Sequence, residues 1–336
     1  MTSGSARPRV LVTGTGGPSG VAFMKALADD PWDIYSADID PYAAGLYLVD
    51  PNHRAIVPRG DDETFVAEII ALCDRERIDV LVPTVDSELL PLAIARSELA
   101  EHGVALVLAS EQTLRGCLDK WALHRSCVGA LRVPDTVLVD ADFDPGACSL
   151  PVIVKPRSGS GSRGVHRVDD VDELARLPRD ATLLVQEYLP GTEYSLDVLA
   201  RGDGAIIAVV PRARLKVDSG IAVTGRTVHD ESLERIGALV AQRIGLTSVA
   251  NVQVKLTGDG EPALLEVNPR FPGTMSLTVA SGVNMPRLCV QDALGIELPS
   301  GMQPFAEIAM VRFLEEHFMD FSEIEALQTD AESVGV

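Results

Sequence analysis

The residues with the clearest chemical potential lie on a predicted β-hairpin over residues 251–270. Polar and apolar residues alternate on both sides of the pair Asp259-Gly260, which is typical of a two-residue hairpin turn. Such a turn places Gln253 opposite Glu266 and Asn251 opposite Asn268. Period-two geometry then puts these four polar side chains on one face of the hairpin, and the other face carries Val252, Val254, Leu265 and Val267.

This polar face has a composition that suits phosphate chemistry. One carboxylate and several amides provide oxygen ligands for a hard cation such as Mg²⁺, and Arg270, just beyond the hairpin, suits phosphate. Two alternatives stay open. Pro262 would lengthen the turn and shift the register, and a solvated antiparallel strand shows the same alternation without any ligand.

A second group of candidates surrounds a lysine at the end of a predicted strand. Lys155 ends the apolar run 151–156, and it must find a partner or reach solvent because an unpaired buried ammonium is costly. The loop 157–164 follows with small residues and two arginines, so its backbone N–H groups could fold over phosphate oxygens. A mobile surface loop is the alternative. The loop lacks the Gly-Lys-Ser/Thr ending of a Walker A loop.

Two further loops follow predicted strands in the first third of the chain. Gly14 and Gly16 fit a dinucleotide-binding fingerprint, but Ser19 takes its third small position, so the segment could equally serve another anion or close packing. Asp86, Ser87 and Glu88 follow the strand 80–83, at the sheet edge where open α/β sheets bind ligands. These carboxylates could hold a substrate ammonium, although a helix start explains Ser87 and Glu88 as well.

The elements that position these residues predict several folded units. Strands and helices alternate over residues 9–108, which predicts a small doubly wound sheet. A helix begins near Leu118, and strands follow at 151–156, 182–189 and 193–198. Asp230 is predicted to cap a helix that ends at Gly245. The acidic residues from about 321 onward are expected to be a poorly anchored tail.

The composition limits the class of protein. The chain has 336 residues, 46% of them hydrophobic and 23% charged, as in a folded globular protein. A formal net charge of −20 opposes non-specific binding to nucleic acid or an anionic membrane. Five scattered cysteines show no metal-ligand spacing, and no apolar run or signal peptide indicates a membrane or export. We expect a soluble, cytoplasmic protein with reduced thiols.

Taken together, the motifs resemble the ATP-grasp superfamily, especially ligases similar to the ATP-binding region of the carbamoyl phosphate synthase large subunit. The resemblance rests on the order and spacing of Asp119-Lys120, Lys155, the glycine-rich loop, Gln186–Leu189, Glu193, Gln253 and Glu266-Val-Asn-Pro-Arg270. It implies an α/β and α+β fold, with a Rossmann-like pre-ATP-grasp domain at 1–112 and a two-subdomain ATP-grasp fold at 113–302. A lid subdomain would cover about 130–190, and a C-terminal strand and acidic tail would cover 303–336.

The resemblance also implies roles for single residues. Lys120 and Lys155 would hold the α- and β-phosphates of ATP. The lid loop over the phosphates would contain Ser158, Gly159, Ser160, Gly161, Ser162 and Gly164. Glu187 and Leu189 would contact the adenine edge, and Glu193 would contact the ribose. Gln186 and Tyr188, in the same segment, would also belong to the nucleotide site. Mg²⁺, or Mn²⁺, would be held by Gln253, Glu266 and Asn268. The transferred phosphoryl group and the substrate carboxylates would contact Arg270, Arg212, Arg214, Lys216 and Arg226.

The implied activity is an ADP-forming carboxylate–amine ligase that works through an acyl phosphate, in natural-product or amino-acid metabolism. Its partners would be a small carboxylic acid and an amine, and the resemblance allows a homodimer. Three other readings stay open. In the first, the acceptor is bicarbonate or is absent, as in a carboxylase or an acyl-phosphate-forming enzyme. The protein could be a nucleotide-binding regulator without turnover. A nicotinamide-dependent dehydrogenase would rest on the first glycine loop alone.

Overall fold

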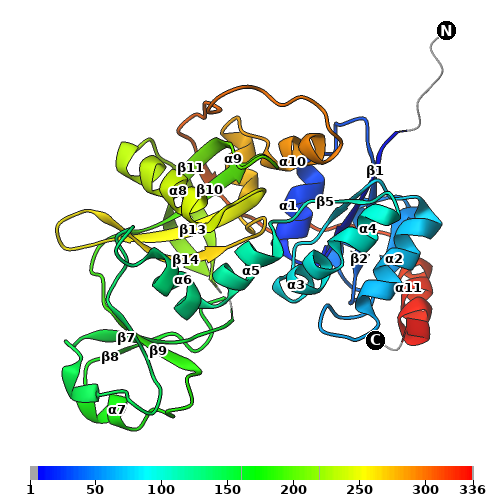
Figure 1. The fold of residues 1–336 in the computed structure, drawn as a ribbon. Coiled ribbons are helices and arrows are strands. Elements are labelled where there is room, and N and C mark those ends of the chain that lie inside the picture. The colour runs from blue at the N-terminus through cyan, green and yellow to red at the C-terminus, as the bar shows by residue number, and fades with distance from the viewer. Residues whose placement is uncertain (1–6, 160, 219, 335–336) are drawn as a thin grey trace.

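A computed structural model describes residues 7–159, 161–218 and 220–334 of the chain. It contains one parallel and two antiparallel sheets (Figure 1), so the predicted mixture of α/β and α+β architecture is confirmed. The parallel sheet has the order β3-β2-β1-β4-β5. Its strands and the helices between them are β1 (Arg9–Thr13), α1 (Pro18–Ala26), β2 (Asp33–Asp38), β3 (Arg54–Ile56), α2 (Phe65–Glu76), β4 (Val80–Val82), α3 (Asp86–Ile94), α4 (Arg96–Glu101) and β5 (Ala105–Leu106).

The central sheet has six antiparallel strands in the order β14-β13-β10-β11-β12-β15. These are β10 (Glu193–Ala200), β11 (Ile206–Asp218), β12 (Ile221–Thr227), β13 (Val249–Leu256), β14 (Pro262–Asn268) and β15 (Ala309–Val311). Helix α8 (Glu231–Ile244) packs against it, between the predicted cap Asp230 and Gly245, which has a φ of 64°. A Cβ on Gly237 would lie 2.7 Å from Val209, so this helix rests directly on the sheet.

The third sheet is small and projects from the molecule, as Figure 1 shows at the lower left. Its order is β6-β9-β7-β8, from β6 (Thr136–Leu138), β7 (Val152–Pro156), β8 (His166–Val168) and β9 (Leu183–Glu187), with α7 (Val171–Ala175) beside it. It has its own cluster of buried apolar residues. Two helices, α5 (Glu111–Leu118) and α6 (Lys120–Cys127), lead into it from the parallel sheet.

Two shared cores fix the parallel sheet against the central sheet. One contains Leu11 and Ile69 together with Leu233 and Val252. The other joins α1 to α9 (Met275–Ala280) and α10 (Met285–Ala293), where the rings of Phe23 and Phe271 meet with centroids 4.8 Å apart. Cavities between these units therefore have rigid walls on both sides.

The hairpin has the predicted register for a reason that the sequence did not reveal. Gln253 pairs with Glu266 and Asn251 with Asn268, but Val254 pairs with Leu264, because the register shifts between Gln253 and Val254. The loop between β13 and β14 is longer than the two residues expected, and the bulge at Leu265 compensates for it. Leu264, rather than Leu265, therefore packs in the core with Val252, Val254 and Val267.

The prediction that the acidic residues from about 321 onward form a poorly anchored tail is wrong. Residues Phe321–Val334 form helix α11, which packs against the parallel sheet near β3. Leu327 and Ala331 are buried in a cluster with Leu46 and Tyr47, and Arg54 Nη1 lies 2.6 Å from Glu323 Oε2. In the described part of the chain, no helix combines the length and apolar character that crossing a membrane requires.

Candidate active site

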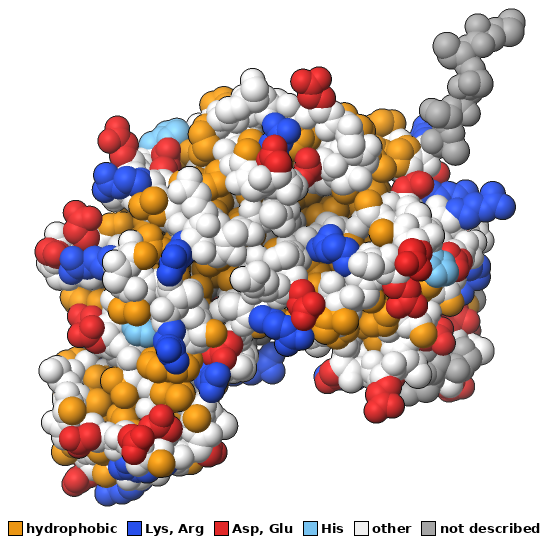
Figure 2. Space-filling model, viewed as in Figure 1, with side chains coloured by type: hydrophobic (Ala, Val, Ile, Leu, Met, Phe, Trp, Pro, Cys, Tyr) orange, Lys and Arg blue, Asp and Glu red, His pale blue; other side chains and the backbone are white. Residues whose placement is uncertain are grey.

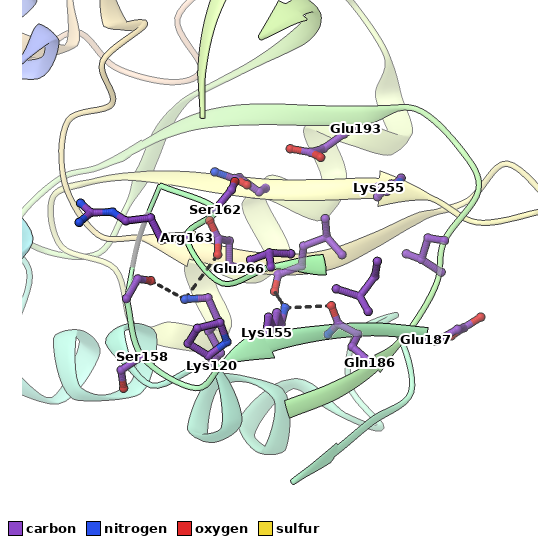
Figure 3. A pocket seen from close by; sticks show the side chains of 17 residues that line it. Lys120, Lys155, Ser158, Ser162, Arg163, Gln186, Glu187, Glu193, Lys255 and Glu266 are labelled. Carbon is purple, nitrogen blue, oxygen red and sulfur yellow. Dashed lines mark hydrogen bonds and ion pairs between the residues drawn. The ribbon is translucent and has the colours of Figure 1, made fainter. Parts of the chain in front are cut away.

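The small sheet and the central sheet enclose a cavity of about 180 Å³ (Figure 3). It brings together most of the residues predicted to bind the nucleotide. Those that line it are Lys120, Lys155, Ser158, Gly159, Ser162, Gln186, Glu187, Leu189 and Glu193, together with Gln253 and Glu266 of the hairpin. Tyr188, Gly161 and Gly164 do not line it, although Gly161 lines the neighbouring cavity described below, and Ser160 lies outside the described residues.

Lys155 is the penultimate residue of strand β7, and its side chain lines this cavity (Figure 3). The side chain is buried, and Nζ donates hydrogen bonds to Gln186 Oε1 at 2.8 Å and to the Leu265 carbonyl at 3.4 Å. The bulge at Leu265 thus offers a carbonyl to the lysine. Burial lowers the pKa of Lys155 to about 8, although the nearby carboxylate of Glu266 favours the charged form.

Lys120, the first residue of helix α6, lines the same cavity as Lys155. Its Nζ lies 3.7 Å from Glu266 Oε2 and donates to the Gly159 carbonyl at 2.6 Å. Two ammonium groups with few anionic partners therefore face one cavity, and their combined charge favours a polyphosphate.

Asp119 precedes Lys120 and holds both the start of helix α6 and the start of the loop 157–164 in place. Asp119 caps helix α6 by accepting from the N–H groups of Trp121 and Ala122, and its carboxylate also lies 2.6 Å from Arg157 Nη2. Arg157 begins the loop 157–164, so Asp119 fixes that loop beside Lys120. Gly159 and Gly161 have φ angles of 117° and 69°, which lets the loop turn back over the cavity.

The far end of the cavity holds the residues predicted to contact adenine and ribose. Glu193 lines the cavity, but its carboxylate is paired with Arg214. Glu187 Oε2 accepts from the Asp135 N–H at 3.2 Å. Arg163, which lies within the predicted loop but was not singled out, and Lys255, which was not predicted, also line the cavity. Lys255 follows Gln253 by two residues, so the alternation of the strand was a signal for it.

A second cavity of about 310 Å³ adjoins the first and shares Ser162, Gln253 and Glu266 with it. The parallel sheet, the lid loop and the central sheet all contribute to its walls. It is lined by the remaining hairpin residues Asn251 and Asn268, by Ser195, Arg214 and Arg270, and by Asp86. Arg270 contacts Asp86 at two points, with Nε 2.5 Å from Oδ1 and Nη2 3.3 Å from Oδ2.

The predicted metal ligands lie together where the two cavities meet. Asn268 Nδ2 donates to Glu266 Oε1 at 3.2 Å, so the two side chains are in contact. Among the described residues, no group of three or more His, Cys, Asp and Glu could hold a metal by itself. One carboxylate with neighbouring amides fits Mg²⁺ that is also bound by substrate phosphates, the arrangement this ion prefers.

Apart from Arg270, the other four basic residues predicted to contact the transferred phosphoryl group or the substrate lie in different environments. Arg214 lines the second cavity, whereas Lys216 and Arg226 are exposed and line neither cavity. Arg212 is fully buried and lines neither cavity, because it is paired with Asp197 at 2.6 Å. Asp197 also accepts from Asn251 Nδ2 at 2.8 Å, so this buried pair supports the cavity floor.

Ser87 and Glu88 line a different cavity, of about 540 Å³, beside the first glycine loop. Glu88 is buried and accepts a hydrogen bond from Thr13 Oγ1 at 2.7 Å, and burial raises its pKa to about 7. The Gly16 N–H donates to Asp38 Oδ2 at 2.6 Å. An internal carboxylate thus occupies one of the backbone donors with which this loop would bind a dinucleotide pyrophosphate.

Comparisons with known proteins agree with this geometry. Residues 179–316 match the family described as ATP-grasp in the biosynthetic pathway with Ter operon, and residues 10–107 match the N-terminal domain of PylC-like proteins.

Several solved structures are similar in fold. One is the biotin carboxylase domain dimer of 2-oxoglutarate carboxylase from Hydrogenobacter thermophilus with MgADP (TM-score 0.72, 18% identity, 89% of this chain and 72% of that chain). Another is L-amino acid ligase from Bacillus licheniformis (0.68, 18%, 87% and 75%). A third is the ADP complex of N5-carboxyaminoimidazole ribonucleotide synthetase (0.71, 18%, 93% and 83%). At this identity they show the shared fold alone.

Proposed function

Because the chain belongs to the ATP-grasp superfamily, we propose that it is an ATP-dependent ligase that joins a carboxylic acid to an amine. The observation that carries the proposal is the meeting of the two cavities at Gln253 and Glu266. One cavity presents two lysines suited to phosphates, and the other presents Arg270 and Asp86, suited to an anion and an ammonium. A nucleotide and a second substrate can therefore approach the same point from opposite sides.

In this proposal the first cavity binds ATP. Lys120 and Lys155 neutralise the α- and β-phosphates, and the loop 157–164 covers them, which excludes water from an intermediate that hydrolyses easily. Bound Mg²⁺ would neutralise charge on the β- and γ-phosphates. Gln253, Glu266 and Asn268 are the residues that would hold it.

The second cavity would bind the acid and the amine. A carboxylate oxygen attacks the γ-phosphorus, the bond to the β-phosphate oxygen breaks, and ADP leaves. Arg270 stabilises the charge on the transferring group. Asp86 would orient the amine in its ammonium form and accept the proton that must leave before the nitrogen lone pair can attack. The lone pair then attacks the acyl carbon, the bond to the phosphate oxygen breaks, and the leaving phosphate takes up the second proton that the nitrogen loses.

The product assay for this proposal uses Mg·ATP with a matrix of amino acids, simple carboxylic acids and amines. We expect ADP and phosphate to form only with a carboxylate–amine pair, with a condensed mass in mass spectrometry. Product formation that requires bicarbonate would identify a carboxylase, and ADP formation with the acid alone would identify an acyl-phosphate-forming enzyme. AMP and pyrophosphate would contradict the acyl phosphate.

The assembly is also a proposal. The similar 2-oxoglutarate carboxylase domain is described as a dimer, and we propose a homodimer for this chain. Light scattering behind a sizing column would give twice the 35.8 kDa mass of one chain. The mass of a single chain would contradict the dimer and leave the ligase proposal intact.

A further inference from the structure

The contact between Asp86 and Arg270 joins two parts of the molecule at the second cavity. Asp86 is the first residue of α3, which follows strand β4 of the parallel sheet, and Arg270 follows β14 of the central sheet. They are 184 residues apart in the chain. Their side chains are 29% and 18% exposed, so both remain accessible from the cavity that they line.

In this contact the Asp86 carboxylate accepts from two donors of the Arg270 guanidinium, Nε and Nη2. A guanidinium that makes two parallel contacts to carboxylate oxygens uses the same fork with which it would bind a phosphoryl group. A phosphoryl group arriving at Arg270 would also lie next to the negative charge of Asp86, which repels it. The remaining terminal nitrogen, Nη1, donates to the Phe271 carbonyl at 3.3 Å, so Asp86 and a phosphoryl group compete for the same Nε and Nη2 donors.

We propose that Asp86 is an internal competitor for the γ-phosphoryl group at Arg270, and that this group displaces Asp86 from the arginine on binding. After displacement Asp86 still lines the second cavity, where its negative charge attracts the ammonium group of the amine substrate. The amine position is completed only after the nucleotide is in place, so the nucleotide binds before the amine. Asp86 is thus a positioning residue. The nucleotide decides whether Asp86 contacts Arg270, and the position of Asp86 then decides how the amine is oriented. This inference rests on the proposed ligase function.

The competition can be measured without knowing the acid or the amine. The probes are Mg²⁺ with ADP, and Mg²⁺ with β,γ-imido-ATP, which carries a γ-phosphoryl group and resists hydrolysis. We expect Asp86→Asn, in the full chain, to bind β,γ-imido-ATP about tenfold more tightly than wild type by calorimetry, since about 1.4 kcal/mol of competition is removed. The affinity of the variant for ADP should stay within about twofold of the wild-type value, because ADP has no γ-phosphoryl group and does not compete with Asp86 for Arg270.

Asp61→Asn is the matched control. Its carboxylate lies 3.0 Å from Arg59 Nε in the same part of the molecule, but the pair is exposed and Asp61 lines none of the cavities described above. This variant should change neither affinity. Asp86→Ser, which also removes the carboxylate and keeps a side chain suited to a helix start, gives the same expected shift if Asp86→Asn does not fold.

The remaining outcomes separate the two proposals. Unchanged affinity for β,γ-imido-ATP, or an equal change for both nucleotides, would overturn the competition while leaving the ligase proposal in place. Weaker binding of β,γ-imido-ATP would mean that Asp86 holds Arg270 ready for the phosphoryl group, which also overturns it. A wild-type protein that binds neither nucleotide would contradict the proposed function and this inference with it.

Discussion

Burial changes the ionisation of Lys155, because it lowers the pKa of the side chain from 10.5 to about 8. Its pKa of about 8 means that, near pH 8, about half of the molecules carry a neutral lysine before nucleotide binds. Phosphates favour the charged form, so nucleotide binding should take up protons near pH 8, and ATP affinity should fall as the pH rises above this value. Calorimetry in two buffers of different ionisation enthalpy measures the uptake.

The control variant for this prediction is Lys155→Gln, which cannot titrate. It should bind Mg·ATP at least about tenfold more weakly, and its proton uptake near pH 8 should be lost. Wild type should also show no uptake near pH 6, where the lysine is already charged. Equal uptake by wild type and variant would assign the proton to another group.

Glu88 makes a prediction about stability. Its pKa is raised by burial from 4.5 to about 7, so the folded state holds a proton that the unfolded state has lost across this interval. The folded protein binds more protons there, and its free energy of unfolding should therefore fall as the pH rises from about 4.5 to 7. Denaturant unfolding across this range measures the slope. Glu88→Gln should flatten it, and an unchanged slope would exclude Glu88 as its source.

At the scale of single residues, the sequence predicted most of the residues that line the cavities, but not the residues with which they form ion pairs. Alternation along a strand was enough to bring Gln253, Glu266 and Asn268 together, because period two is a local property. The ion pairs Glu193–Arg214, Arg212–Asp197 and Asp86–Arg270 were missed. Each joins different elements, and only the tertiary fold decides which charged residues meet.

At the scale of elements, helix α11 was the main error. Its acidic composition suggested a tail, yet Ile324, Leu327 and Ala331 recur at helical spacing, which was the available signal. The predicted hairpin register was right although the turn was not, because the bulge at Leu265 offsets the longer loop. A bulge leaves no clear mark in a single sequence, since any residue type can occupy one.

The packing of α11 can be tested directly. Leu327 is 5% exposed in the cluster with Leu46 and Tyr47. Leu327→Ala should lower the free energy of unfolding by about 2–5 kcal/mol, because it removes buried methyl groups and leaves a cavity. Leu239→Ala, at a helical position that is 44% exposed, should change it by less than about 1 kcal/mol. Equal effects in denaturant unfolding would mean that α11 does not contribute to the core.

For the molecule as a whole, the sequence predicted the fold class, an N-terminal parallel sheet combined with antiparallel sheets, because the motifs typical of that class occur in a fixed order along the chain. It did not predict that the parallel sheet shares two cores with the central sheet, nor that the second cavity lies between them. Those features depend on contacts between residues far apart in sequence. The acid and the amine depend on the shape of that cavity, which no motif describes.

Glu266 lies where the two cavities meet, so its loss should affect the reaction rather than the fold. We expect Glu266→Ala to lower ADP formation by at least about a hundredfold, since charge at the transferring phosphoryl group would lose its carboxylate-held counterion. Its thermal unfolding should stay within a few degrees of wild type. Glu261→Ala, an exposed residue of the same hairpin, should retain full activity. Wild-type activity in Glu266→Ala would exclude Glu266 as a metal ligand.

The central claim is that an acyl phosphate forms between the two cavities, and oxygen transfer tests it most directly. The acid identified in the product assay would be labelled with ¹⁸O in its carboxylate and incubated with Mg·ATP and the amine. The proposed reaction places one ¹⁸O atom in the released phosphate, because the carboxylate oxygen that attacks phosphorus leaves with it. Phosphate without the label, or label in AMP, would contradict the acyl phosphate.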